Sequence, residues 1–128
     1  MAIKEVLYSN LAPEAVGPYS QGIASGDLIF TSGQVPINAQ TGKIEATTIE
    51  EQTEQVMQNL KCVLAQGGVS FDRVVKTTCF LADINDFAAF NGVYAKYFPE
   101  NAPARSCVQV AALPLGAKVE VEVIAVRG

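Results

Sequence analysis

The pattern of apolar and polar residues is clearest between residues 48 and 68, where it predicts a helix from about residue 49 to residue 66. Thr48 stands three residues before Glu51, which is the spacing of a capping box at a helix N-terminus. Gly67 and Gly68 then provide a stop. Between these signals, apolar residues recur on one stripe at roughly 100° per residue. The stripe consists of Ile49, Val56, Leu60, Val63 and Leu64.

A second predicted helix runs from about residue 84 to residue 97 and follows Asp83, whose side chain can cap it. Its aromatic residues recur at helical spacing and are expected in the core; they include Phe87, Phe90 and Tyr94. Apolar runs and alternating patterns before and after the helices predict strands. These strands cover residues 3–8, 23–25, 28–31, 74–81, 105–112 and 118–126.

The resulting order β, β, β, α, β, α, β, β predicts an α+β fold. We expect one domain, residues 1–128, in which two helices pack on one face of a mixed β-sheet. The composition is 49% hydrophobic and only 17% charged, whereas charged residues make up about 25% of an average soluble domain. The uncovered sheet face is therefore expected to pack against copies of the same chain.

Charge and cysteine content narrow the classes of partner and cofactor. The net charge of −4, without any run of Lys or Arg, argues against nucleic-acid binding. Three cysteines without CxxC spacing and the absence of histidine predict neither a metal site nor a disulfide framework. Free thiols are typical of a reducing cytosol, and neither a membrane-spanning run nor a signal peptide is evident. We expect a cytoplasmic protein without a cofactor.

The last two predicted strands contain the best candidates for a functional site. Strand alternation places Arg105, Cys107 and Gln109 on one face. Burying Arg105 and Glu120 in a valine-rich sheet is costly unless both serve a purpose. If the two strands form a simple hairpin centred near Leu115, Arg105 and Glu120 lie about 13 Å apart, which leaves room for a small organic acid.

Four stretches of the chain resemble the RidA/YjgF family of reactive-intermediate (enamine/imine) deaminases, and together they span nearly the whole sequence. The most specific is Pro103-Ala104-Arg105-Ser106-Cys107-Val108, followed by Ala111, Leu113 and Val119-Glu120-Val121. The others are Gly17-Pro18-Tyr19-Ser20-Gln21-Gly22, Phe30-Thr31-Ser32-Gly33-Gln34-Val35-Pro36, and Asp83-Ile84-Asn85-Asp86-Phe87 with Asn91 and Tyr94. One small departure is Val121, where the family more often has Met or Ile.

The resemblance implies a chorismate-mutase-like fold and a homotrimer with clefts between subunits. It also implies hydrolysis of 2-iminobutanoate, 2-iminopropanoate and related imines to 2-keto acids and ammonia. In that reaction Arg105 would bind the substrate carboxylate, and Glu120 would position or activate the attacking water. The other pocket residues that it implies are Tyr19, Ser32, Gly33, Asn91 and the backbone of Cys107.

Elementary chemistry favours the same assignment. An arginine binds a carboxylate through two parallel hydrogen bonds, and an imine carbon is electrophilic enough to react with a well-placed water. Two other functions stay open: a ribonuclease or translation inhibitor, which the acidic charge disfavours, and a non-catalytic trimer that binds small carboxylates or unfolded chains. Without a histidine to activate it, Cys107 is not expected to be a nucleophile. Asp83 and Asp86 suit helix capping better than metal binding.

Overall fold

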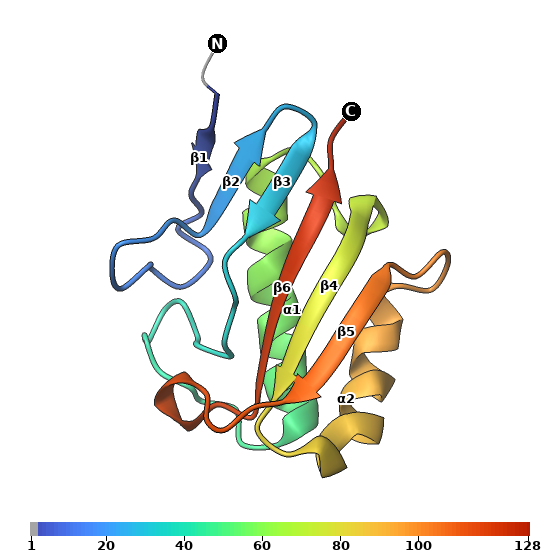
Figure 1. Cartoon of the computed structure of the whole chain (residues 1–128). Coiled ribbons are helices and arrows are strands. Elements are labelled where there is room, and N and C mark those ends of the chain that lie inside the picture. Colours follow the sequence, from blue (N-terminus) through green and yellow to red (C-terminus); the bar gives the residue numbers. More distant parts are fainter. Residues whose placement is uncertain (1–2) are drawn as a thin grey trace.

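The computed structural model describes residues 3–128, and in this part of the chain it contains six strands and two α-helices in the expected order (Figure 1). Both helices lie on one face of the sheet, so the predicted α+β architecture is confirmed. None of the described helices has the length and apolar character needed to cross a membrane. The elements are β1 (Glu5–Leu7), β2 (Gly22–Ser25), β3 (Leu28–Thr31), α1 (Ile49–Gln66), β4 (Val74–Leu81), α2 (Phe87–Tyr94), β5 (Ala104–Gln109) and β6 (Val119–Val126).

The six strands form one mixed sheet in the order β1-β2-β3-β6-β4-β5. Strand β5 is parallel to β4, and the other neighbouring strands are antiparallel. The predicted hairpin between the last two strands is wrong, because β4 lies between β5 and β6. The cause is the α2 crossover, which returns the chain parallel to β4 and leaves β5 at the sheet edge. The loop after β5 then leads past the end of β4 to β6 (Figure 1).

The core lies between the sheet and the helices. Alternate residues of β6 are buried there, as the sequence pattern predicts, and so are the residues of the α1 stripe. Because α1 contacts both β3 and β6, it covers the middle of the sheet, and α2 packs beside it. The buried residues of β6 are Val119, Val121, Val123 and Ala125.

The second helix is shorter than the sequence predicts. Only Phe87–Tyr94 is α-helical, and 3₁₀ turns at Ile84–Asp86 and Ala95–Tyr97 flank it. Asp83 does cap the first turn, since its Oδ1 accepts a hydrogen bond from the Asn85 amide at 2.9 Å. Phe90 and Tyr94 are buried as expected, but Phe87 is 38% exposed. Its core assignment is wrong because α2 lies over the edge of the sheet, where only part of the helix surface is covered.

The sheet face opposite the helices is uncovered in the single chain. Large apolar side chains point outward from it, among them Phe30 on β3 and Val108 on β5, which are 41% and 46% exposed. Exposed apolar side chains gathered on one face are typical of surfaces that pack against another molecule. These residues favour the prediction that partner subunits cover this face, which stays a prediction.

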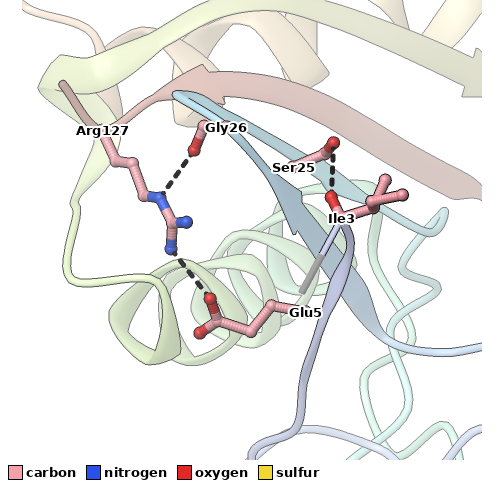
Figure 2. A network of polar contacts seen from close by, with 5 residues as sticks. All are labelled: Ile3, Glu5, Ser25, Gly26 and Arg127. Atoms are coloured by element: carbon pink, nitrogen blue, oxygen red, sulfur yellow. Dashed lines mark hydrogen bonds and ion pairs between the residues drawn. The ribbon is translucent and has the colours of Figure 1, made fainter. Parts of the chain in front are cut away.

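The two ends of the described chain are tied to each other at the β2–β3 turn (Figure 2). Arg127 donates from Nε to the Gly26 carbonyl at 3.1 Å and contacts Glu5 Oε1 from Nη1 at 3.4 Å. On the neighbouring strand, Ser25 Oγ donates to the Ile3 carbonyl at 2.9 Å. Gly26 adopts a positive φ of 58° in this turn, a conformation that glycine adopts without steric cost. The network closes the sheet end far from the loops discussed below.

The capping box of α1 allows a test of the helix assignment. Thr48 Oγ1 accepts from the Glu51 amide at 3.1 Å, and Glu51 Oε1 accepts from the Thr48 amide at 3.3 Å. We expect Thr48→Ala to lower the free energy of unfolding by about 1 kcal/mol, because the Glu51 amide loses its acceptor. Urea denaturation measures the change. Thr47→Ala is the matched control, since the Thr47 side chain is exposed and has no part in the box; equal losses in both variants contradict the assignment.

Candidate functional site

Arg105 is enclosed by neutral side chains on the helix-covered face of the sheet. From β5 its Nη1 donates a hydrogen bond of 2.7 Å to Asn91 Oδ1 on α2. The guanidinium carbon lies 5.3 Å from the ring centre of Phe87, 6.0 Å from Phe90 and 4.9 Å from Tyr94. These distances fit cation–π contacts, which stabilise a positive charge without neutralising it. The predicted pair Arg105 and Asn91 is therefore brought together in one chain.

No acidic side chain neutralises Arg105 within residues 3–128, where the single ion pair joins Arg127 to Glu5. A guanidinium has five N–H donors, and the bond to Asn91 is the one side-chain bond that Arg105 makes in the described chain. The group borders a shallow cavity of about 320 Å³, which is also lined by Tyr94, Phe98 and Pro103. An oriented positive charge with free donors beside a cavity is suited to bind an anion.

The aromatic wall of Arg105 was not identified from the sequence. Phe87 and Tyr94 were assigned to the core, yet both contact the guanidinium. The Tyr94 hydroxyl shares a 2.8 Å hydrogen bond with Thr77 Oγ1 on β4, and Thr77 is the direct neighbour of Arg105 in the sheet. Burial raises the pKa of Tyr94, so its hydroxyl stays neutral. The available signal was the helical spacing of residues 87, 90, 91 and 94 beside a strand that carries an arginine.

Cys107 lies on the same sheet face as Arg105 and opposite Cys79 of β4. Burial raises the pKa of Cys107, and the charge of Arg105 offsets only part of this effect. Burial also raises the pKa of Cys79 to about 12. Both thiols therefore keep their protons near neutral pH, where a thiolate would be needed for nucleophilic attack. The absence of a nucleophilic role for Cys107 stays a prediction.

A second, larger cavity brings together the other predicted site residues: Tyr19, Ser32, Gly33 and Glu120. It has a volume of about 780 Å³ and lies where three loops meet. In Figure 1 these are the loops after β1, after β3 and before β6, at the lower left. The sequence did not predict four further lining residues of interest, which are Glu14, Glu122, Pro114 and Leu115.

The close approach of Gly33 to Glu120 follows from the local backbone. Beside Gly33, Gln34 exchanges two backbone hydrogen bonds with Val121, at 2.9 and 3.2 Å, and so adds a short bridge to the edge of β6. A Cβ atom on Gly33 would overlap Glu120 Oε2, so a larger residue here requires the flexible Glu120 carboxylate to move. Gly33 has no positive φ, so glycine provides space here and not a special backbone conformation. Ser32 is fixed in turn, because its Oγ donates to the Ser20 carbonyl at 2.5 Å.

The second cavity is acidic. Burial raises the pKa of Glu120, and the negative charge of Glu122 on the same strand raises it further. Glu14 also lines the cavity, and it accepts a hydrogen bond from the Tyr8 hydroxyl. A half-buried carboxylate with a raised pKa is a stronger base than an ordinary one. By itself, however, such a cavity repels an anionic ligand.

Arg105 and Glu120 lie on opposite faces of the sheet, which corrects the predicted gap of about 13 Å on one face. In the ladder, Thr77 of β4 pairs with Arg105, and its side chain is buried under the helices. Phe80 pairs with Glu120. Because side chains alternate along a strand, residues 77 and 80 point to opposite faces. The structure thus holds two half-sites, one cationic and one acidic, that cannot meet within one chain.

Two comparisons concern related sequences. Residues 9–127 match the family described as Endoribonuclease L-PSP. The chain is 51% identical over 122 residues to Reactive Intermediate Deaminase A, chloroplastic, of Arabidopsis thaliana, covering 95% of this chain and 65% of that protein. It is also 47% identical over 124 residues to a RutC family protein of Pyrococcus abyssi, covering 97% of this chain and 98% of the relative.

Solved structures share the fold. The crystal structure of Escherichia coli TdcF with bound serine superimposes with a TM-score of 0.93 at 42% identity, covering 97% of this chain and 99% of that one. The Escherichia coli YjgF gene product gives a TM-score of 0.92 at 41% identity, with coverage of 97% and 99%. At this similarity the two matches cover nearly the whole chain.

The contact between Gly33 and Glu120 can be tested directly. In Gly33→Ala the new methyl group displaces the Glu120 carboxylate, which needs to move by about 1.5 Å to reach ordinary contact distance. Crystal structures of the variant and the unaltered protein would show the shift. Gly92→Ala is the control, because an added Cβ there meets nothing within 4 Å. An unmoved Glu120 in the Gly33 variant would show that the close approach is wrong.

Proposed function

The chain belongs to the RidA/YjgF family, the family described as Endoribonuclease L-PSP, and we propose that it hydrolyses reactive 2-imino acids to 2-keto acids and ammonia. The substrates that we propose are 2-iminobutanoate, 2-iminopropanoate and related enamines and imines. The observation that carries this proposal is the state of Arg105: a fixed guanidinium in an aromatic wall, with free donors and no acidic partner within residues 3–128. A short carboxylate is the ligand that such a group is built to hold.

In the proposed complex Arg105 binds the substrate carboxylate through its two free parallel N–H groups. Asn91 holds the guanidinium in a fixed orientation, since its Oδ1 accepts a hydrogen bond from Arg105 Nη1. The aromatic rings of Phe87 and Tyr94 exclude water from one side of the charge, and a charge-assisted hydrogen bond is stronger when water is excluded. The serine bound to TdcF is also a small molecule with a carboxylate.

Glu120 acts on the water. The imine reacts in its protonated form: Glu120 accepts a proton from the water as the water oxygen bonds to the imine carbon, and the C=N electron pair moves to nitrogen. The product is a neutral carbinolamine. Glu120 then returns its proton to that nitrogen and accepts the hydroxyl proton as the C=O bond forms and the C–N bond breaks, so ammonia leaves and the 2-keto acid remains. The raised pKa of Glu120 assists both steps, because a base works best when the pKa of its acid lies near the working pH.

The proposed active site is completed by two protomers. Arg105 with Asn91 and Cys107 comes from one chain, and Glu120 with Tyr19, Ser32 and Gly33 comes from the next. Two observations support this arrangement: the half-sites lie on opposite faces of one sheet, and the face that carries Glu120 exposes apolar residues such as Phe30 and Val108. A closed ring of identical chains repeats one interface, so a homotrimer has three equal sites.

Ribonuclease activity is the weaker candidate. The larger cavity is lined by Glu14, Glu120 and Glu122, and it therefore repels the phosphates of a nucleic acid. A non-catalytic carboxylate binder would use the Arg105 half-site but would have no use for a basic carboxylate in a cavity. The activity assay below separates this class from an enzyme.

The role of Arg105 predicts a large and specific loss of activity. With a threonine dehydratase generating 2-iminobutanoate, we expect Arg105→Ala to lower kcat/KM for 2-ketobutyrate formation about 100-fold or more, because the substrate carboxylate loses its counter-charge. Arg105→Lys keeps the charge but not the paired donors, so its kcat/KM should lie between the values of the unaltered protein and of Arg105→Ala. Arg73→Ala, an exposed arginine outside both cavities, is the matched control. Full activity of Arg105→Ala would refute the carboxylate role.

The two-chain site predicts complementation between inactive variants. Arg105→Ala and Glu120→Gln chains that carry different tags are co-expressed in equal amounts. If the chains assemble randomly into a ring, about a quarter of the interfaces contain both a native Arg105 and a native Glu120. Doubly tagged assemblies should therefore recover a substantial part of the activity that each variant lacks alone. If Arg105 and Glu120 of one chain served the same site, mixing would restore nothing.

A further inference from the structure

We propose that Leu115 is a specificity-determining residue, which receives the apolar side chain of the substrate and favours branched aliphatic 2-imino acids over the smallest ones. This inference rests on the proposed function. Leu115 lies in the loop before β6 and lines the same cavity as Glu120. Neither the resemblance nor the half-site geometry assigns it a role.

The backbone at Leu115 is unfavourable for a leucine. Its φ of 57° and ψ of 24° lie in the left-handed region, which side chains with a Cβ atom seldom occupy. Its side chain is 70% exposed, so the leucine gains no burial within the chain that would offset this cost. Glycine or asparagine would suit the position better on both counts. A residue held in a strained conformation without a packing reason is a candidate for function.

The loop holds Leu115 in a defined place. The turn is closed by hydrogen bonds from the Gly116 amide to the Leu113 carbonyl at 3.3 Å and from the Ala117 amide to the Pro114 carbonyl at 3.1 Å. Directly after it, the Lys118 amide donates to Gln52 Oε1 of α1 at 2.8 Å. Ala117 itself is buried. The side chain of Leu115 is therefore presented from a fixed backbone.

The lining of the cavity combines polar and apolar groups. The polar groups include Glu120 against Gly33, and Ser32. The aliphatic lining residues are Val16, Val35, Ile37, Pro114 and Leu115. A volume of about 780 Å³ is within the range of about 300–1,000 Å³ that holds ligands much larger than a three-carbon acid. The cavity is thus suited to a ligand with one polar end and one apolar end.

The geometry of an imine carbon indicates that the substrate side chain contacts the aliphatic residues of the cavity lining. That carbon carries three groups: the carboxylate, the nitrogen and the side chain. The carboxylate is directed to Arg105 of the neighbouring protomer, and the nitrogen and attacking water are directed to Glu120. The third group points to what remains of the cavity, where Leu115 is the largest exposed aliphatic side chain.

Kinetics with two imines test the inference. Imines of leucine and of alanine are generated by an amino-acid oxidase, and kcat/KM is measured for each. We expect Leu115→Ala to lower the value about tenfold for the leucine-derived imine and by less than about twofold for the alanine-derived one, because only the larger side chain reaches residue 115. Leu115→Asn, which accepts the left-handed backbone but is polar, should show the same selective loss. Leu115→Met, which keeps a large apolar side chain, should retain the preference of the unaltered protein for the leucine-derived imine.

The control is Leu11→Ala, since Leu11 is 69% exposed and lies outside the cavity; it should change neither value. Size-exclusion chromatography of each variant confirms that assembly is preserved. If Leu115→Ala leaves both values unchanged, or lowers both equally, the specificity role is overturned while the deaminase activity stands. If the unaltered protein hydrolyses neither imine, the proposed function fails and this inference fails with it.

Discussion

Successive side chains of a β-strand point to opposite faces of a sheet, and this alternation determines how the two half-sites can work. Arg105 of β5 and Glu120 of β6 are both linked to β4, through Thr77 and Phe80. These partners are three positions apart along β4, so the arginine lies under α2 and the glutamate lies on the uncovered face. No side-chain rotation moves either group through the sheet. A reaction that needs both requires a second copy of the chain.

The electrostatics of the half-sites are complementary. Arg105 is surrounded by an amide and three aromatic rings, which hold its charge without cancelling it. Glu120 lies near Glu122, whose negative charge raises the pKa of Glu120. Each half therefore carries an unbalanced charge, at some cost to the isolated chain. In the two-chain site that we propose, a ligand with one carboxylate would join the halves and reduce both imbalances, so substrate binding and assembly would favour each other.

The sequence predicted features that depend on local patterns. The capping box at Thr48, the apolar stripe of α1 and the alternation of β6 each follow from a few neighbouring residues, and the structure confirms all three. Strand order is non-local: the adjacency of the last two strands in the sequence predicts a simple hairpin, whereas β4 lies between β5 and β6 in the sheet. The aromatic wall of Arg105 could not be predicted for a similar reason. The helical spacing of Phe87 is the same whether its ring points to the core or contacts a guanidinium. The contact between Gly33 and Glu120 depends on the Gln34–Val121 bridge, which no local pattern indicates.

Because the sequence contains no histidine, the general base that we propose is a carboxylate, Glu120, and its burial bears directly on that proposal. A free glutamate is a weak base at neutral pH, because its conjugate acid is too strong. Burial and the charge of Glu122 raise its pKa, so the carboxylate holds a transferred proton more readily than an ordinary glutamate does. As the pH falls, a carboxylate with a raised pKa is protonated, and so loses its function as a base, at a higher pH than an ordinary glutamate. In the two-chain site that we propose, Arg105 of the next protomer would oppose this shift, since a positive charge favours the ionised carboxylate. The strength of the proposed base would therefore be set jointly by the acidic cavity and by the neighbour that completes it.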